Sequence, residues 1–317
     1  MTAPTPPTTP RVLVLGAANM DIAASSPHRL EAGDSTPGTI RHAPGGVARN
    51  VAENLGRLGH AVALLAPVGD DLFGRSLLAG TQQAGVDVQA CWVLPDAATS
   101  TYLSLHGPDG DMQVAVNDMG IVDRLTPEHL RTRATLLAQA DTWMLDGNLS
   151  PALLEWLFGE AGSIPVFVDP VSAFKCRRFL PWLARIHTLK LNRLEAEALW
   201  GRALDTDAAI TGCAHWLHAQ GVRQVVLSLG VRGAYGSVAD GASAWAAALP
   251  VPVCNATGAG DALMAGLLHG HRRGFDLSEA LGFATGCAAL TVMAPQANHP
   301  GLSVQAVHQL RQRHAPP

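Results

Sequence analysis

The sequence predicts an α/β protein in which a mostly parallel β-sheet is covered by helices on both faces, with a small β lid added. Three observations support this prediction: short apolar runs recur along the chain, helical stretches lie between them, and two inserted segments break the alternation. Alternation of this kind is typical of a parallel sheet, because each parallel connection needs a crossover long enough to form a helix.

The predicted elements of the body follow one another in chain order. The apolar run at 12–15 ends at Gly16, as expected for a buried first strand that leads into a loop. Small and apolar residues at helical spacing over 46–58 end at Gly59, which predicts a helix and its stop, and a strand over 61–68 follows. Further elements are expected as strands at 142–145, 166–168 and 225–227 and as helices at 151–162 and 208–220.

The lid is predicted from the two inserted segments, at about 23–43 and 99–117. In the second, TSTYLSLH and MQVAVN flank the turn-forming sequence GPDGD, which predicts a β-hairpin. Residues 1–10, rich in proline and threonine, are expected to be a disordered tail before a single domain at 11–317. The C-terminal part is expected to be helical over 258–273, 278–293 and 303–313.

The composition argues against a nucleic-acid polymer or a membrane as a partner. The net charge is -4 and no local run of Lys and Arg occurs, so no basic field is available for a phosphate backbone. No apolar run reaches the roughly 20 residues that span a bilayer. The five cysteines are scattered and form no CxxC pair. We therefore expect a cytoplasmic protein with reduced thiols.

The segment VCNATGAGDALMAG, at 253–266, carries the strongest chemical signal. Gly258, Ala259 and Gly260 open an apolar helix, so N-H groups with little side chain around them form an anion-binding terminus. Asp261 follows in the first turn, where its carboxylate is expected to stay ionised and to accept a proton from a substrate hydroxyl. An ordinary first-turn acid beside closely packed glycines is the alternative interpretation.

A second glycine-started helix is predicted in HAPGGVARNVAENLGRLG, at 42–59. Gly45 and Gly46 permit close approach of the backbone to a ligand, and Asn50 follows one turn later. Together the two helices resemble the ribokinase-like (PfkB-type) carbohydrate kinase family, which combines a GGxxxN helix with a later GAGD helix. The resemblance covers 12–313. It implies a three-layer α/β/α body with a β lid, ATP as the phosphoryl donor, and magnesium (Mg2+) as the metal.

The resemblance also implies roles for individual residues. Asp261 would be the catalytic base, and Gly258, Ala259 and Gly260 would form the anion hole. The implied contacts to the ribose hydroxyls come from Asn19, Asp21, Gly45, Gly46 and Asn50. The implied nucleotide site comprises Asn192, Glu195, Ser228, Gly230, Gly233 and Thr257, with Glu195 ordering magnesium through water.

Within the family, five stretches are similar to bacterial pseudouridine kinases, at 34–50, 100–106, 116–119, 166–176 and 186–197. This similarity implies transfer of the ATP γ-phosphoryl group to the 5′-hydroxyl of pseudouridine. Another kinase of the same family, acting on adenosine, uridine, ribose or a fructose phosphate, is the first alternative. A non-catalytic sugar-binding regulator on the same fold is the second, and the presence of Asp261 and Glu195 disfavours it.

Further substrate contacts are expected from Lys175 and from the lid. Lys175 follows a predicted strand end, where α/β ligand sites lie, although a solvated surface lysine is the alternative. Alternate residues of a strand share a face against which a flat base can lie. A lid that merely excludes water is the alternative for the four candidate lid contacts, Ser100, Tyr102, Asn117 and Asp118.

Two departures from the family pattern bear on cofactors. Asn255 and Ala256 stand where many relatives have Asp-Thr, and that acid helps to bind an activating monovalent cation, so a potassium (K+) requirement is in doubt. Leu191 stands where the motif around Asn192 usually has proline, which affects backbone stiffness rather than a reacting group. The resemblance further implies a homodimer formed through the lid strands, since an exposed sheet edge readily pairs with its symmetry mate.

Overall fold

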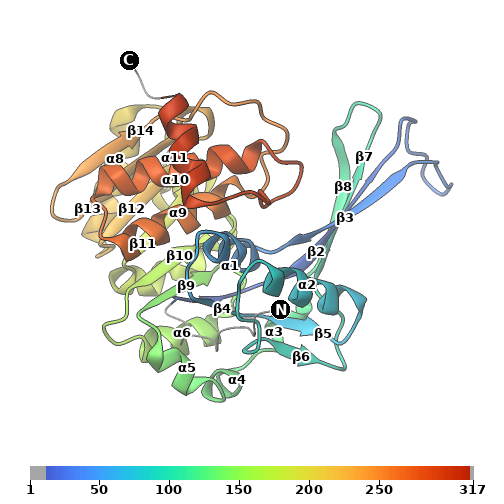
Figure 1. Cartoon of the computed structure of the whole chain (residues 1–317), viewed down its shortest axis with the longest axis horizontal. Coiled ribbons are helices and arrows are strands. Elements are labelled where there is room, and N and C mark those ends of the chain that lie inside the picture. The colour runs from blue at the N-terminus through green and yellow to red at the C-terminus, as the bar shows by residue number, and fades with distance from the viewer. Residues whose placement is uncertain (1–11, 315–317) are drawn as a thin grey trace.

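An eight-stranded sheet forms the centre of the body, in the order β14-β13-β12-β11-β10-β9-β1-β4 (Figure 1). This computed structural model describes residues 12–314, and the tail expected at 1–10 lies outside them. The parallel strands are β1 (Val12–Leu15), β4 (Val62–Leu65), β9 (Thr142–Asp146), β10 (Val166–Asp169), β11 (Thr188–Asn192) and β12 (Gln224–Ser228). The antiparallel strands β13 (Ala234–Val238) and β14 (Ser243–Ala246) extend one edge. The predicted mostly parallel sheet is thus confirmed.

Helices cover both faces of this sheet, as predicted. Alternate residues of β1 face opposite layers: Val12 and Val14 join one core, and Leu13 and Leu15 join the other. The first core is completed by α1 (Val47–Arg57), α2 (Leu72–Gln83), α9 (Ala259–Arg273), α10 (Leu277–Val292) and α11 (Val304–Arg313). The second is completed by α4 (Pro127–Arg131), α5 (Ala134–Gln139), α6 (Pro151–Glu160), the 3-10 helix η1 (Cys176–Arg185), α7 (Arg193–Trp200) and α8 (Asp207–Ala219).

The strand expected over 61–68 is divided in the structure, which corrects that prediction. Its first part is β4, and its second is β5 (Pro67–Gly69), which pairs instead with β6 (Trp92–Leu94). Pro67 has no backbone N-H, so it cannot continue the ladder of β4. At the same point the carbonyl of Ala66 accepts a hydrogen bond from the backbone N-H of Trp92 at 3.1 Å, which turns the chain towards β6.

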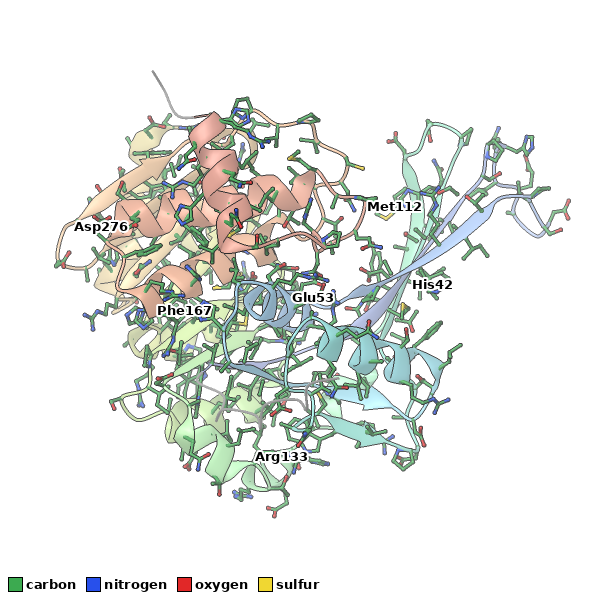
Figure 2. All side chains as sticks on the ribbon, in the orientation of Figure 1. His42, Glu53, Met112, Arg133, Phe167 and Asp276 are labelled. Carbon is green, nitrogen blue, oxygen red and sulfur yellow. The ribbon has the colours of Figure 1, made fainter. Side chains whose placement is uncertain are left out.

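A second sheet projects from the body and contains both inserted segments (Figure 1). It consists of β2 (Asn19–Ser25), β3 (Thr39–Gly45), β7 (Thr101–His106) and β8 (Met112–Asp118), in the order β3-β2-β7-β8. His42 and Met112 mark its two outer strands in Figure 2. The strands β7 and β8 form the predicted hairpin around the turn at 107–111.

The register of the second sheet gives it two unlike faces. One cross-strand row joins Asp21, Tyr102 and Asn117, and the next row, on the opposite face, joins Leu103 and Val116 to β2. Leu103 is 37% exposed and Val116 is 63% exposed. One face is therefore polar in the row that contains Asp21, and the other exposes apolar side chains.

The cysteine side chains lie mostly in the interior of the protein. Cys91, Cys176, Cys213 and Cys287 are buried, Cys254 is exposed, and all five are free thiols. Burial raises the pKa of the Cys91 thiol to about 12, so it behaves as a small apolar side chain. None of the helices within 12–314 has the length and apolar character needed to cross a bilayer.

Candidate functional site

The candidate residues gather where parallel strands end. Asp146, Asp169, Asn192 and Ser228 are the last residues of β9, β10, β11 and β12, four strands that lie side by side. The carboxyl ends of parallel strands meet at one edge of a sheet, and ligands bind in the crevice outside that edge. Residues far apart in the sequence therefore form one site.

The start of α9 has the backbone geometry of an anion-binding terminus. Gly258 is the N-cap residue, with φ at 81°, and a Cβ built on it would lie 1.9 Å from the carbonyl oxygen of Ala297. Only glycine fits this position without displacing the neighbouring chain. The first N-H groups of an α-helix have no intrahelical acceptor. That of Ala259 donates to the carbonyl oxygen of Ala256 at 3.4 Å, and the next ones are available to an anionic ligand.

Asp261 lies in the first turn of α9 and is 8% exposed. Its Oδ2 accepts a hydrogen bond from Nδ2 of Asn50 at 2.7 Å, which joins the two glycine-started helices at one carboxyl group. Burial, and then the nearby charge of Asp169, raise the pKa of Asp261 to about 7, while Lys190 and Asn50 act in the opposite direction. Because desolvation favours the neutral acid, the ionised form expected for Asp261 is less favoured than its place in the first helical turn alone suggests.

Beneath α9 lies a buried ion pair that sequence reasoning missed. Lys190 Nζ lies 2.6 Å from Asp169 Oδ2, and their side chains are 5% and 2% exposed. A Cβ on Gly260 would lie 2.9 Å from the same Nζ, so the ammonium supports the first turn of the helix. The signal in the sequence was Lys190 itself, a charged residue between two leucines of a strand-like run.

Asn192 and Glu195 form a capping box at the start of α7. Asn192 Oδ1 accepts from the backbone N-H of Glu195 at 2.9 Å, and Glu195 Oε2 accepts from the backbone N-H of Asn192 at 2.8 Å. Glu195 is 1% exposed, and burial raises its pKa although Lys190 acts in the opposite direction. The pair thus has a structural role in addition to any ligand contact, and it places the Glu195 carboxylate beside Lys190.

The candidate sugar wall is assembled by direct contacts. Asn19 Nδ2 donates to Asp21 Oδ1 at 2.5 Å. A Cβ on Gly45 would lie 2.4 Å from Asp21 Oδ2, and a Cβ on Gly46 would lie 2.4 Å from the carbonyl oxygen of Ala17. At Gly46 glycine is needed because the backbone of another segment runs against it, whereas at Gly45 the absence of a side chain leaves room for the Asp21 carboxyl group. The wall reaches Asp261 through Asn50.

A second missed residue, Asp146, holds this wall in place. Its side chain is fully buried, and Oδ2 accepts from the backbone N-H of Ala17 at 2.9 Å and of Ala48 at 3.1 Å. Gly46, at the N-cap position of α1, has no side chain to cap that helix, so a carboxylate from β9 does so instead. Asp146 therefore fixes the loop after β1 to the start of α1.

Lys175 reaches the same edge of the sheet. Its Nζ donates to Oδ1 of Asn148 at 2.5 Å, and Asn148 Nδ2 donates to Asp146 Oδ2 at 3.0 Å. Burial lowers the pKa of the Lys175 ammonium, although Asp146 acts in the opposite direction. Lys175 is thus tied to the network of Asp146, unlike a freely solvated surface lysine.

The lid candidates divide between the two faces of the second sheet. Tyr102 and Asn117 share a row with Asp21, and Ser100, which is 1% exposed, lies two residues before Tyr102. Asp118 belongs to the next row, on the other face, and its Oδ1 accepts from the backbone N-H of Gly120 at 3.2 Å. The structure therefore does not bring Asp118 together with the other three, because neighbouring residues of a strand point to opposite faces.

A cavity of about 570 Å³ leads to the start of α9. Ser228, Gly230 and Gly233 line it, whereas Thr257 is not among its lining residues. It is also lined by Val231, Leu249, Val251, Val253, Leu263, Ala289 and Val292, and by Ala259 and Gly260 at the start of α9. A largely apolar cavity that includes the start of a helix suits an aromatic group that carries phosphates.

Comparison with known proteins agrees with this geometry. The profile of the pfkB family carbohydrate kinases matches residues 9–303. The chain is 44% identical over 299 residues to the pseudouridine kinase of Escherichia coli, which covers 94% of this chain and 96% of that protein. It is 40% identical over 291 residues to the uncharacterized sugar kinase YeiI of the same organism, which covers 92% of this chain and 80% of that protein.

Solved structures share the fold. A putative sugar kinase from Clostridium perfringens superposes with a TM-score of 0.85 at 28% identity, over 96% of each chain. The Arabidopsis thaliana ribokinase complexed with ribose and ATP superposes with a TM-score of 0.84 at 20% identity, over 96% of this chain and 99% of that one. The profile match and the two Escherichia coli relatives show that the chain belongs to the pfkB family of carbohydrate kinases and is a sugar or nucleoside kinase.

Proposed function

We propose that the chain is a cytoplasmic kinase that transfers the γ-phosphoryl group of ATP to the 5′-hydroxyl of pseudouridine. The observation that carries this proposal is the position of Asp261. Its carboxyl group is hydrogen-bonded to Asn50 of the sugar wall and stands in the first turn of α9, the helix whose first residues line the apolar cavity. The 44% identity to a pseudouridine kinase supports the choice of acceptor.

The chemistry follows from these positions. Asp261 takes the proton of the acceptor hydroxyl as the hydroxyl oxygen forms a bond to the γ-phosphorus. The bond from that phosphorus to the oxygen bridging it to the β-phosphate breaks, and ADP leaves. The N-H groups of the anion hole at Gly258, Ala259 and Gly260 stabilise the charge on the moving phosphoryl group. A pKa of about 7 leaves Asp261 able to accept a proton at neutral pH, and its basic form increases as pH rises.

The residues present suit a magnesium ion that arrives with the nucleotide. Within 12–314 no group of three or more His, Cys, Asp or Glu side chains is placed to hold a metal by itself. Magnesium commonly binds one or two carboxylates together with substrate phosphates. Around Lys190 lie three carboxylates, those of Asp169, Glu195 and Asp261, so the cluster has an acidic excess. We assign Glu195 to order the ion through water, and the bound ion would offset charge on the phosphates.

The acceptor is tested with a panel of substrates. ADP release is measured with pseudouridine, uridine, adenosine, ribose and fructose 1-phosphate at matched concentrations, and kcat/KM is compared. We expect pseudouridine to give the highest value, because the polar row of Asp21, Tyr102 and Asn117 can hydrogen-bond the edge of a base. A preference for ribose or a sugar phosphate would contradict the pseudouridine assignment and would favour a function closer to that of a sugar kinase.

A potassium requirement is not expected. Asn255 Nδ2 donates to the carbonyl oxygen of Pro295 at 3.1 Å, and its Oδ1 accepts from the backbone N-H of Thr257 at 2.9 Å. Both ends of a neutral amide are thus engaged at the position where the family pattern has a carboxylate. We expect kcat to change less than about twofold when potassium is replaced by tetramethylammonium, while EDTA removes activity. Activation by potassium of tenfold or more would contradict this prediction.

The apolar face of the second sheet is proposed to pair with a second copy of the chain. Ile40, Leu103, Val114 and Val116 expose 74%, 37%, 49% and 63% of their surfaces. Apolar exposure on a projecting sheet marks an interaction surface. We expect a dimer in sedimentation velocity and a monomer for Val116→Asp. The neighbouring change Asn117→Asp, on the other face, should leave the dimer intact, and a monomeric parent protein would contradict the proposal.

A further inference from the structure

Arg49 is a buried cation that connects the sugar wall to the rest of the body. It is 2% exposed and lies on α1, the helix that also carries Glu53, labelled in Figure 2. Its Nη1 donates to Glu53 Oε2 at 2.5 Å. Its Nη2 donates to Asn50 Oδ1, to Asn298 Oδ1 at 2.5 Å and to the carbonyl oxygen of Pro44 at 3.2 Å. One guanidinium thus contacts four separate acceptors.

These contacts fix which way the amide of Asn50 points. A guanidinium only donates hydrogen bonds, so the amide oxygen of Asn50 must face Arg49. The amide nitrogen then faces Asp261, to which it donates at 2.7 Å. A turn of the amide by 180° would set two donors against each other at Arg49 and two acceptors against each other at Asp261. The guanidinium therefore determines the hydrogen bond that Asp261 receives.

Asn298 extends this network to the loop at 294–300. Its Nδ2 donates to the carbonyl oxygen of Asn50 at 3.0 Å and to Asn54 Oδ1 at 2.9 Å. The same loop supplies the carbonyl of Ala297, against which Gly258 packs at the start of α9. The loop is therefore held on one side by α1 and on the other by the anion-binding turn, and the network links the two helices that form the site.

Arg49 also contributes its charge. The charged groups that act on Asp261 come from three elements: Asp169 on β10, Lys190 on β11 and Arg49 on α1. The same guanidinium acts on Asp21 of the sugar wall. Because Asp169 is already paired with Lys190, Arg49 is the cation on the α1 side of the catalytic carboxyl group.

We propose that Arg49 is a positioning residue for phosphoryl transfer, which holds the Asn50 amide with its nitrogen towards Asp261 and keeps α1 in register with the start of α9. The inference rests on the proposed function in one respect, namely that Asp261 is the base. Arg49 itself is expected to touch neither substrate. Its loss should therefore affect the rate of transfer more than the binding of the acceptor.

The kinetic test compares three variants. In Arg49→Met, kcat is expected to fall about 100-fold with a smaller change in KM for the acceptor, because the base loses its fixed geometry. The acidic limb of the profile of kcat/KM against pH should rise by about one pH unit, because a positive charge near Asp261 is lost. In Arg49→Lys the limb should return towards that of the parent protein while kcat stays reduced, since an ammonium keeps the charge but lacks the planar fork of donors that spans these acceptors.

Arg57→Met is the matched control. Arg57 is on the same helix and pairs with the same glutamate, its Nη2 lying 2.7 Å from Glu53 Oε1, but it is partly exposed. Its other contact is the carbonyl oxygen of Pro300, at the far end of the loop, rather than Asn50. This variant should keep the parent kcat and pH profile. Equal losses in Arg49→Met and Arg57→Met would overturn the proposal, because they would show a general effect of the α1 ion pairs.

A titration without substrate separates this inference from the proposed function. The carboxyl carbon of Asp261 is followed by ¹³C NMR, with Asp261→Asn to assign the signal. A higher midpoint in Arg49→Met than in Arg57→Met supports the inference even if no tested sugar or nucleoside is phosphorylated, a result that would overturn the proposed function alone. Equal midpoints would overturn the inference. If Arg49→Met does not fold, Arg49→Gln, which removes the charge and keeps a hydrogen-bond donor, takes its place in the same comparison.

Discussion

Replacement of Asp261 by asparagine is expected to lower kcat by about 10³-fold or more, with little change in nucleoside binding. The substitution keeps the size of the side chain and removes the group that accepts the proton, and general-base catalysis contributes about 10²- to 10⁴-fold. Turnover is measured by coupled ADP release, and nucleoside binding by calorimetry in the absence of ATP.

The control for this experiment is Asp240→Asn. Asp240 is exposed in the turn between β13 and β14, where its Oδ1 accepts from the backbone N-H of Ala242 at 3.2 Å. It removes the same charge far from the site and should leave kcat unchanged. If Asp261→Asn turned over at a near-normal rate, Asp261 would not be the base. The alternative of a non-catalytic regulator would gain support only if the parent protein also failed to turn over every acceptor.

Replacement of Lys190 by methionine is expected to lower the free energy of unfolding by about 3–5 kcal/mol. Lys190 and Asp169 are both almost fully buried and lie 2.6 Å apart, so loss of the ammonium leaves a carboxylate without its partner in the interior. Removing both partners, in Lys190→Met with Asp169→Leu, should restore part of the stability because the carboxylate paired with Lys190 is removed with it, while Glu195 and Asp261 remain. The free energies of unfolding of the parent protein, the single variant and the double variant are measured by urea denaturation.

An exposed ion pair provides the comparison. Arg75 Nη1 lies 2.7 Å from Asp70 Oδ1, at nearly the same separation, but the side chains are 64% and 57% exposed. Arg75→Met should therefore cost less than about 1 kcal/mol, since water screens the pair and solvates the acid that remains. A loss in Lys190→Met as small as that in Arg75→Met would show that water reaches Asp169 in the folded protein.

Local signals determined which segments form the body of the protein. The apolar run at 12–15 became β1, and the sequence GPDGD became the turn between β7 and β8. These features depend on alternation, helical periodicity and turn residues, which act over a few neighbouring residues. A break in the strand at Pro67 could be predicted, because proline has no N-H. The pairing of β5 with β6 could not, because Trp92 lies 25 residues after Pro67 and no local pattern indicates the contact.

The sequence by itself indicated the family, through the joint presence of two glycine-started helices, and it singled out Asp261, after its glycines, as the proposed base. Only the tertiary structure decided the state of that acid. Asp169 and Lys190 come from strands that are neighbours in the sheet, and Arg49 and Asn50 come from a helix more than 200 residues earlier. Desolvation and Coulomb interactions depend on distance in space, so the proton affinity of Asp261 and the direction of the Asn50 amide are set only when the chain has folded.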